Sequence, residues 1–475
     1  MGAIPNKLRV SPHRSPPLSL VILRSLQLCR HSAQTLGTAM NQTDITTATR
    51  VGNCADEPIH IPGSIQPHGF LLAVDESSLI IRQLSANCDG LLSIAAAEAL
   101  GRPLEQFLTS ESLRELREKL RGDDLRQVNP IKIQCAGAAN VWNAIAQRNQ
   151  ELLILEIESS VSGDPSFLDV YRKINAAVEA IGAAADLTEL YQITVRWVKE
   201  LTGYQRVMIY EFDSEWNGRV VAEIREAHQE PFLGLHYPAS DIPAQARRLY
   251  TKNWLRTIPD ITYSPSPILP GHHHLSGGPL DLSGCSLRSV SPVHIQYLKN
   301  MGVGASTSIS VIKDGVLWGL IALHHERAAY LPFEVRQGLE FIGRIFSLQH
   351  AAREKLENRD YKNQLKNLQG QLEHKMKQQA DFIDGLLREP PDFTALVQGC
   401  CGGAILHRGK LTLIRDTPTE QEIRDLTAVA DAENPPGTEP PMSGQWPVLE
   451  SQQKIFSPRQ TGMAKRTSIR CVPPR

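Results

Sequence analysis

A long amphipathic segment, residues 339–387, is the feature that most constrains how this 475-residue chain can fold. Apolar residues recur in it at helical spacing, and the last five lie 4, 3, 4 and 4 residues apart, close to a heptad seam: Tyr361, Leu365, Leu368, Leu372 and Met376. A continuous helix of this length would extend about 72 Å, which is longer than an ordinary domain. We therefore expect a helix that runs between domains and pairs with its own copy in a homodimer.

Two domains that mix helices and strands are predicted before this helix. In residues 51–160, GFLLAVD and SLIIRQLS are short apolar strands joined by a DESS turn, and ELLILEIES closes the domain as another strand. In residues 168–345, a helical LTELYQITVRWVKELTG precedes the strand RVMIYEFD, and TSISVIKDGVLWGLIALHH predicts two strands around a KDG turn.

The remaining segments are less regular. Residues 389–431 predict a strand pair and a helix that would open a third domain, whereas residues 432–475 are rich in proline and indicate a disordered tail. Residues 1–50 contain no acidic residue before Asp44. Their apolar stretch is only six residues long, so we interpret them as disordered or as lying upstream of a true start at Met40, rather than as a targeting peptide.

Composition excludes several classes of function. Lys and Arg number 50 and Asp and Glu 51, so the chain lacks the basic field of a nucleic-acid-binding protein. No apolar run is long enough to span a membrane. The eight cysteines are scattered without a CxxC pair, which argues against a disulfide scaffold or a zinc module and favours reduced thiols in a cytoplasm. Three adjacent histidines, His272–His274, cannot all bind one ion, so no metal site is expected.

The second domain concentrates polar residues that could bind a small molecule. In YPASDIPAQARRLY, Asp241 stands just before an Ile-Pro pair, where it could simply cap a helix. Arg256 follows, and LRSVSPVHIQYLKNMGVGAS brings together Arg288, His294 and Tyr297, the last two on one face of a predicted helix. A lone histidine is usually only a core residue. Several polar anchors on an apolar domain nevertheless favour a pocket for an anionic ligand, because arginine binds carboxylates in a bidentate manner.

Another unusual stretch lies near the start of the first domain, where Cys54 precedes IHIPGSIQPHG. Free cysteines are usually small buried hydrophobic residues, so spacing alone leaves the role of Cys54 open. The prolines and glycines make the stretch rigid and rich in turns, which suits a segment threaded against another part of the protein.

Four motifs in this order resemble the bacterial phytochromes over residues 50–431: Cys54 with IHIPGSIQPHG, YPASDIPAQARRLY, LRSVSPVHIQYLKNMGVG and LWGLIALHH. The resemblance implies an α+β fold in which a PAS domain (51–160) and a GAF domain (168–345) each have an antiparallel sheet with flanking helices. A long connecting and dimerisation helix (339–388) would join them to a GAF-like PHY domain, of which residues 389–431 would be a part. The resemblance also implies that the N-terminal segment is threaded through a loop of the GAF domain.

The cofactor that this resemblance implies is biliverdin IXα, a linear tetrapyrrole with two propionates. The thiolate of Cys54 would form a thioether with its A-ring vinyl group. Plant and cyanobacterial relatives attach more reduced bilins to a cysteine directly before the pocket histidine. Val293 occupies that position here, which favours biliverdin.

The resemblance also assigns roles to residues of the second domain. Asp241 would offer its main-chain carbonyl to the pyrrole nitrogens, and His294 would lie over the rings and hold a bridging water. The remaining contacts would be Arg256 and Arg288 with propionate, Ser306 and Ser308 with the other propionate, Tyr210, Tyr250 and Tyr297 with the D-ring, and His324 with the D-ring carbonyl.

The function implied is that of a red/far-red light receptor that signals by D-ring isomerisation. The chain has no kinase phospho-acceptor box and no Gly-rich ATP motif, so we expect no enzyme and a signal that passes to a downstream protein, for example one that regulates transcription. Without a complete PHY domain, little far-red photoproduct is expected. The alternatives are a dimeric PAS/GAF regulator that senses another small molecule and a disrupted product that folds without signalling. Cys285 could be a packed thiol or a second contact to the chromophore.

Overall fold

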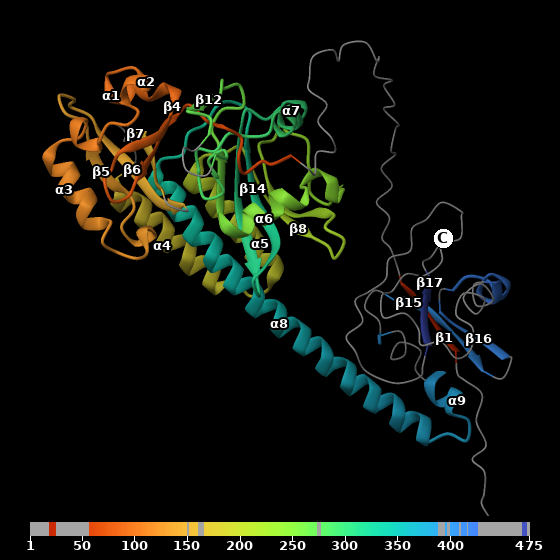
Figure 1. Cartoon of the computed structure of the whole chain (residues 1–475). Helices are drawn as coiled ribbons and strands as arrows, with labels where there is room; N and C mark the ends of the chain where they lie inside the picture. The colour runs from red at the N-terminus through yellow and green to blue at the C-terminus, as the bar shows by residue number, and fades with distance from the viewer. Residues whose placement is uncertain are drawn as a thin grey trace, which may run out of the picture. The chain divides into compact units, whose positions relative to one another are not determined.

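The computed structural model describes residues 19–24, 57–149, 152–159, 166–272, 277–387, 395–396, 400–407, 410–415, 417–425 and 468–472. These form two compact units, one within residues 42–356 and the other from residues 1–41 and 357–475. Figure 1 shows the elements of each unit. The cavity described below lies in the first unit, which contains both predicted domains.

The first domain is built on an antiparallel sheet in the strand order β2-β12-β4-β3-β7-β6-β5. Its strands are β2 (Ser64–Ile65), β3 (Gly69–Asp75), β4 (Ile81–Ser85), β5 (Ile131–Gln134), β6 (Val141–Asn149), β7 (Leu152–Ser159) and β12 (Ser266–Leu269). Helices α1 (Asp89–Leu92), α2 (Ala96–Ala99) and α3 (Ser110–Lys119) supply residues to the core on one face of this sheet. The strand predictions GFLLAVD and ELLILEIES correspond to β3 and β7.

The second domain has a six-stranded antiparallel sheet in the order β10-β9-β8-β14-β13-β11. Its strands are β8 (Arg206–Phe212), β9 (Gly218–Ile224), β10 (His236–Tyr237), β11 (Leu255–Ile258), β13 (Ala305–Lys313) and β14 (Val316–His325). Alternate residues of β8 face opposite sides, as the strand period requires. Val207 and Ile209 join the core formed with helices α4 (Phe167–Ala183), α5 (Leu187–Thr202) and α8 (Phe333–Lys377), whereas Met208 and Tyr210 face the side of α6 (Ala244–Lys252).

One strand of the first sheet comes from the second domain. Strand β12 pairs with β2 and β4, so residues 266–269 extend the sheet of the other domain. On its other side, the segment around β2 bonds to residues 282–289: the Gln66 amide donates to the Leu287 carbonyl (2.7 Å) and the Ser289 amide to that of Ser64 (3.2 Å). Residues 60–66 therefore pass between two arms of one loop of the second domain, in agreement with the threading that the resemblance implied.

The long helix differs in its ends from the sequence prediction. Helix α8 covers Phe333–Lys377, and a separate helix α9 (Phe382–Leu387) follows, whereas one helix over 339–387 was expected. The chain turns back because α9 packs closely on the end of α8: a Cβ at Gly385 would lie 2.6 Å from the Cα of Met376. Leu372 is buried in a small core with residues of α9 and the following strands, so the end of the heptad seam is covered locally.

The second unit contains a four-stranded sheet in the order β16-β15-β1-β17. The predicted strand pair corresponds to β15 (Cys400–His407) and β16 (Lys410–Arg415). The other two strands, β1 (Ser19–Arg24) and β17 (Ser468–Val472), come from segments in which the sequence analysis expected no strand. The assignment of residues 389–431 to a PHY domain stays a prediction.

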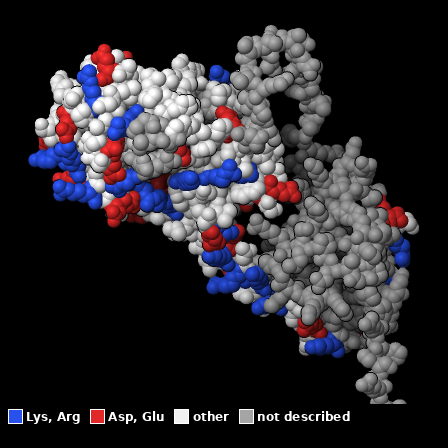
Figure 2. All heavy atoms as spheres, in the orientation of Figure 1, with Lys and Arg blue, Asp and Glu red and all other residues white. Residues whose placement is uncertain are grey.

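Charged side chains of both signs are interspersed on the face shown in Figure 2. The formal net charge of the whole chain is −1. Among the helices that the structure describes, none is both long enough and apolar enough to cross a bilayer.

His350 connects α8 to the core of the second domain. It is 1% exposed, its Nε2 lies 3.0 Å from the Tyr191 hydroxyl, and its ring centroid lies 4.0 Å from that of Trp318. Burial lowers the pKa of His350 to about 4, so the folded state favours the neutral ring.

This burial predicts an acid-dependent loss of stability. The unfolded chain takes up the His350 proton near pH 6.5, so the free energy of unfolding should fall between about pH 6.5 and 4, by at most about 1.4 kcal/mol per pH unit for this group. Urea unfolding of His350→Gln at pH 7 and 5 should show a smaller difference than the unaltered chain. The exposed His272→Gln is the control, and an equal pH effect in His350→Gln would contradict the assignment.

Candidate functional site

A cavity of about 320 Å³ lies in the second domain, among α6, α7 (Pro292–Asn300), β11 and β13. Its volume is within the range of small-molecule sites. Eight of the residues predicted from the sequence line it: Asp241, Tyr250, Arg256, Arg288, His294, Tyr297, Ser306 and Ser308. The structure therefore brings together residues that are up to 67 positions apart, from Asp241 to Ser308.

Two short helices position the polar groups on one side of the cavity. Helix α7 begins at Pro292, and the hydroxyl of Ser291 caps it by accepting a hydrogen bond from the Val293 amide (3.2 Å). The predicted i, i+3 pair is confirmed in geometry: the rings of His294 and Tyr297 are nearly parallel, with centroids 5.9 Å apart.

Asp241 does not cap α6, which was the simple alternative for this residue. It ends a short 3-10 turn (Ala239–Asp241), and the N-cap position of α6 is Pro243, which has no side-chain cap. The carboxylate of Asp241 instead accepts a hydrogen bond from the Tyr297 hydroxyl (3.3 Å). This bond joins the α6 and α7 sides of the cavity.

Arg256 and Arg288 bring two guanidinium groups to the opposite side. Arg256 extends from β11, rather than from a helix, and donates to the carbonyls of Ser286 (2.9 Å) and Arg288 (2.5 Å). Arg288 donates to the carbonyl of Ile59 (2.6 Å), and its Nε is buried without a hydrogen-bond partner. Burial and, to a smaller extent, the neighbouring charge of Arg288 together lower the pKa of Arg256 to about 9, so an anion here would stabilise the charged guanidinium groups.

Two serines of β13 complete this side. Ser308 pairs across the sheet with Arg256, and Ser306 with Ile258, so both hydroxyl-bearing residues stand next to the β11 arginine. Hydroxyl groups can both donate and accept hydrogen bonds. The arginines and serines together form a polar end that suits carboxylates.

Two predicted residues, Tyr210 and His324, are not among those lining the cavity. His324 pairs across the sheet with the lining residue Ser306, and its Nδ1 is buried without a partner. Burial lowers the pKa of His324 to about 3 and that of His294 to about 4, so both rings are neutral at neutral pH. A neutral ring with an unused nitrogen can donate or accept one further hydrogen bond.

An aromatic cluster lies beside the cavity. Tyr210 is 8% exposed, and its ring centroid lies 5.8 Å from that of Tyr237, a residue of the YPASD motif that the sequence analysis did not select. The close approach of β9 requires a glycine, because a Cβ at Gly218 would lie 1.7 Å from the Tyr210 ring. Tyr250 packs against the same cluster and also lines the cavity.

The segment after Cys54 also reaches the cavity. Glu57 and Ile59 line it, and the carboxylate of Glu57 accepts a hydrogen bond from the Ser291 hydroxyl (2.6 Å). Cys54 itself lies outside the described residues, three positions before Glu57. Sequence reasoning missed Glu57 and Ile59 as lining residues, although Ile59 begins the rigid IHIPG run and Glu57 lies two residues before it.

Cys285 lies in a different environment. Its side chain is 1% exposed, belongs to the apolar cluster between the two domains, and accepts a hydrogen bond from the Gln147 amide (2.7 Å). Burial raises its pKa well above the usual value, so the reactive thiolate is disfavoured. Of the two interpretations of Cys285, the structure favours the packed thiol.

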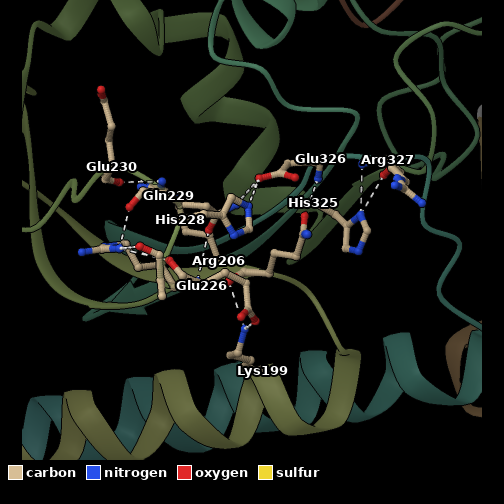
Figure 3. Close-up of polar contacts among 12 residues, drawn as sticks. Lys199, Arg206, Glu226, His228, Gln229, Glu230, His325, Glu326 and Arg327 are labelled. Atoms are coloured by element: carbon tan, nitrogen blue, oxygen red, sulfur yellow. Dashed lines mark hydrogen bonds and ion pairs between the residues drawn. The ribbon is translucent and has the colours of Figure 1, made fainter.

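Polar contacts outside the cavity fix the loop that leads to Tyr237 (Figure 3). Glu326, just after β14, lies 2.7 Å from His228 Nε2 and accepts a hydrogen bond from Gln229 (3.1 Å), while Arg206 donates to the Glu230 carbonyl (2.7 Å). These contacts indicate that His228, Gln229 and Glu326 have a structural role.

Across the described part of the chain, no cluster of three or more potential metal ligands occurs, and His272 is exposed.

Comparisons with known proteins agree with this architecture. The model of the PAS fold matches residues 54–160, and that of the GAF domain matches residues 186–352, which confirms the two expected domain types. Cyanobacterial phytochrome B of Nostoc sp. is 42% identical over 392 residues, covering 82% of this chain and 52% of the relative. A bacteriophytochrome of Xanthomonas campestris pv. campestris is 39% identical over 330 residues, 68% of this chain and 51% of the relative. The chain thus spans about half the length of these relatives.

Solved structures show the same similarity. The photosensory core module of a Stigmatella aurantiaca phytochrome has a TM-score of 0.69 at 41% identity, with 83% of this chain and 78% of that chain covered. The wild-type chromophore-binding domain of a phytochrome from the same organism has a TM-score of 0.59 at 47% identity and covers 62% of this chain, with 98% of that chain matched.

Proposed function

The chain belongs to the bacterial phytochromes, and from this membership we propose that it is a light receptor that holds biliverdin in the cavity of its GAF domain. The observation that carries the proposal is the polar end of the cavity. There, Arg256 and Arg288 use backbone carbonyls as hydrogen-bond acceptors, and Arg288 Nε has none. A dianionic ligand would supply the missing negative charge.

The residues around the cavity fit a linear tetrapyrrole. When bound, a bilin supplies the photochemistry, the light-driven isomerisation of its terminal ring. Arg256, Arg288, Ser306 and Ser308 would hold its two propionates, and the backbone carbonyl of Asp241 would accept hydrogen bonds from the pyrrole N–H groups. His294 would lie over the rings.

The other end of the ligand would lie among the aromatic residues. The unused Nδ1 of His324 would contact the carbonyl of the terminal ring, and Tyr210, Tyr237 and Tyr297 would surround that ring. A rotation of the ring would then exchange hydrogen bonds around the Asp241–Tyr297 contact, which lies between α6 and α7. Tyr250 belongs both to the aromatic cluster and to the lining of the cavity.

Cys54 is the residue we propose for covalent attachment. Glu57, only three residues later, lines the cavity, and a connection of three residues would be short enough to keep the thiol within about 11 Å of that residue. Cys285 is buried among apolar side chains and is not among the lining residues.

Attachment predicts a clear result on denaturing gels. The full chain co-expressed with heme oxygenase should be coloured and should give zinc-induced fluorescence after denaturation. Cys54→Ser should lose most of this fluorescence, whereas the matched control Cys285→Ser should keep it. The reverse pattern would show that the attachment site is wrong, and a colourless chain would favour a regulator that senses another small molecule.

The arginines predict a second result. Arg256→Ala and Arg288→Ala should each slow assembly with biliverdin by about tenfold or more, because a charge-assisted hydrogen bond contributes roughly 1.5–3 kcal/mol. Stopped-flow absorbance measures this rate. Arg196→Ala, on the exposed face of α5, is the control. Assembly at the unaltered rate in both variants would contradict the propionate assignment.

We also propose that the chain is a homodimer that passes its signal to a separate protein. Large apolar side chains are exposed on two helices that pack together: Leu168 and Tyr171 on α4, and Phe341, Leu348 and Leu356 on α8. Three of these recur along α8 at spacings of 7 and 8 residues, which suits pairing with a second helix.

Dimerisation can be tested at the most exposed of these positions. Leu348 is 67% exposed, so Leu348→Glu should leave the fold intact and convert the dimer to a monomer in sedimentation velocity experiments. Val316→Glu, at a position that is 57% exposed at the start of β14, should remain dimeric. An unchanged dimer in Leu348→Glu would show that this face of α8 does not form the interface.

A further inference from the structure

Two buried acidic residues of the PAS domain face the GAF domain. Glu156 and Glu158 lie on β7, and each is 1% exposed. They continue the face of β7 that carries Leu152 and Ile154, which pack against residues 280–287 of the other domain. Buried carboxylates are costly unless they are paired or hydrogen-bonded, so their partners indicate their role.

Both carboxylates hold the same short loop. Glu156 Oε1 accepts a hydrogen bond from the backbone amide of Leu287 (2.6 Å). Glu158 forms a buried ion pair with Arg336 of α8 (Nη1 to Oε1, 3.1 Å), and the same Nη1 donates to the hydroxyl of Ser286 (3.2 Å).

The opposite side of this loop bonds to the cavity. The carbonyls of Ser286 and Arg288 accept the two shorter of the three hydrogen bonds that Arg256 donates, and Arg288 itself lines the cavity. Residues 286–288 therefore lie between the carboxylates of the PAS domain and the arginines of the GAF domain. A shift of this backbone would move the acceptors that orient Arg256 and the Cα from which Arg288 extends.

The charges of this region agree with such a role. Three guanidinium groups, those of Arg256, Arg288 and Arg336, lie near the buried carboxylates of Glu156 and Glu158, and Asp281 adds a further negative charge near Arg288. Burial raises the pKa of Glu156 to about 7, which makes its neutral form accessible near neutral pH. The hydrogen bond from Leu287 needs only an acceptor oxygen, which the neutral acid also provides.

We propose that Glu156 and the Glu158–Arg336 pair are positioning residues for the ligand's acidic groups, so that the PAS domain sets the affinity of the GAF cavity for a dianion. This inference rests on the proposed function. It assigns a binding role to PAS residues that do not line the cavity and act only through the loop 286–288.

The test compares two ligands that differ only at the two propionate groups: biliverdin, which carries free carboxylates, and its neutral dimethyl ester. Both are titrated by absorbance into the full chain carrying Cys54→Ser, so that binding is reversible. In this background, Glu156→Leu removes the acceptor for the Leu287 amide, whereas Glu156→Gln keeps it. The double replacement Glu158→Leu with Arg336→Met removes the ion pair without leaving a lone buried charge.

We expect Glu156→Leu and the double replacement to weaken biliverdin binding by about tenfold or more, on the scale of one lost charge-assisted hydrogen bond. Binding of the ester should change by less than about twofold in both variants, and Glu156→Gln should bind both ligands as the parent does. Arg353→Lys, another buried arginine of α8 that bonds to the Ala184 carbonyl, is the control for reduced stability.

Equal weakening for both ligands, or no weakening for either, would overturn the proposal, because a merely structural role does not distinguish the acid from the ester. If Glu156→Leu does not fold, the double replacement decides by the same comparison. A parent chain that binds neither ligand would refute the proposed function and this inference with it. A parent that binds both, with variants that do not discriminate, would refute this inference alone.

Discussion

The rest of the PAS and GAF domains depends on the hydrogen bonds of one residue, Gln66. Its side-chain amide donates to the carbonyls of Thr257 (3.2 Å), Ser286 (3.4 Å) and Arg288 (3.4 Å), and its backbone amide donates to Leu287 (2.7 Å). One residue of the threaded segment therefore fixes both β11 and the loop 286–288. These two segments carry the arginines of the cavity, so the threading that joins the domains also shapes the site.

The loop 286–288 accordingly has four sets of partners, from the PAS strand β7, the threaded segment, the cavity arginine Arg256 and Arg336 of α8. A loop held from all sides has few alternative conformations, which lowers the entropy cost of ordering the site when a ligand binds. It also explains how PAS residues outside the cavity can affect a GAF ligand. The first turns of α8 are joined to this loop through Arg336, so a change in the cavity has a short physical route to the long helix.

Many elements of the fold and several residues of the candidate site could be predicted from the sequence, because the signals for them are local. The strand and helix periods predicted β3, β7, β13, β14 and α7, and the motifs around Asp241 and His294 indicated a pocket for an anion. The predicted ends of the long helix were wrong. At its C-terminal end, the turn at residues 378–381 depends on α9 packing against α8 through Gly385, a contact that helical periodicity does not report. The simple capping role of Asp241 was wrong for a similar reason, because its partner Tyr297 is 56 residues away.

The sequence by itself indicated which residues are candidates for a site: two arginines, histidines and an aspartate in recognisable motifs, with a cysteine ahead of a rigid proline-rich segment. Only the tertiary structure decided which of them meet. It placed Glu57 and Ile59 at the cavity and Tyr237 beside Tyr210, and it packed Cys285 away from the lining residues. The physical reason is that motifs report local backbone preference and side-chain chemistry, whereas burial and partner choice come from contacts such as Glu158 with Arg336, 178 residues apart.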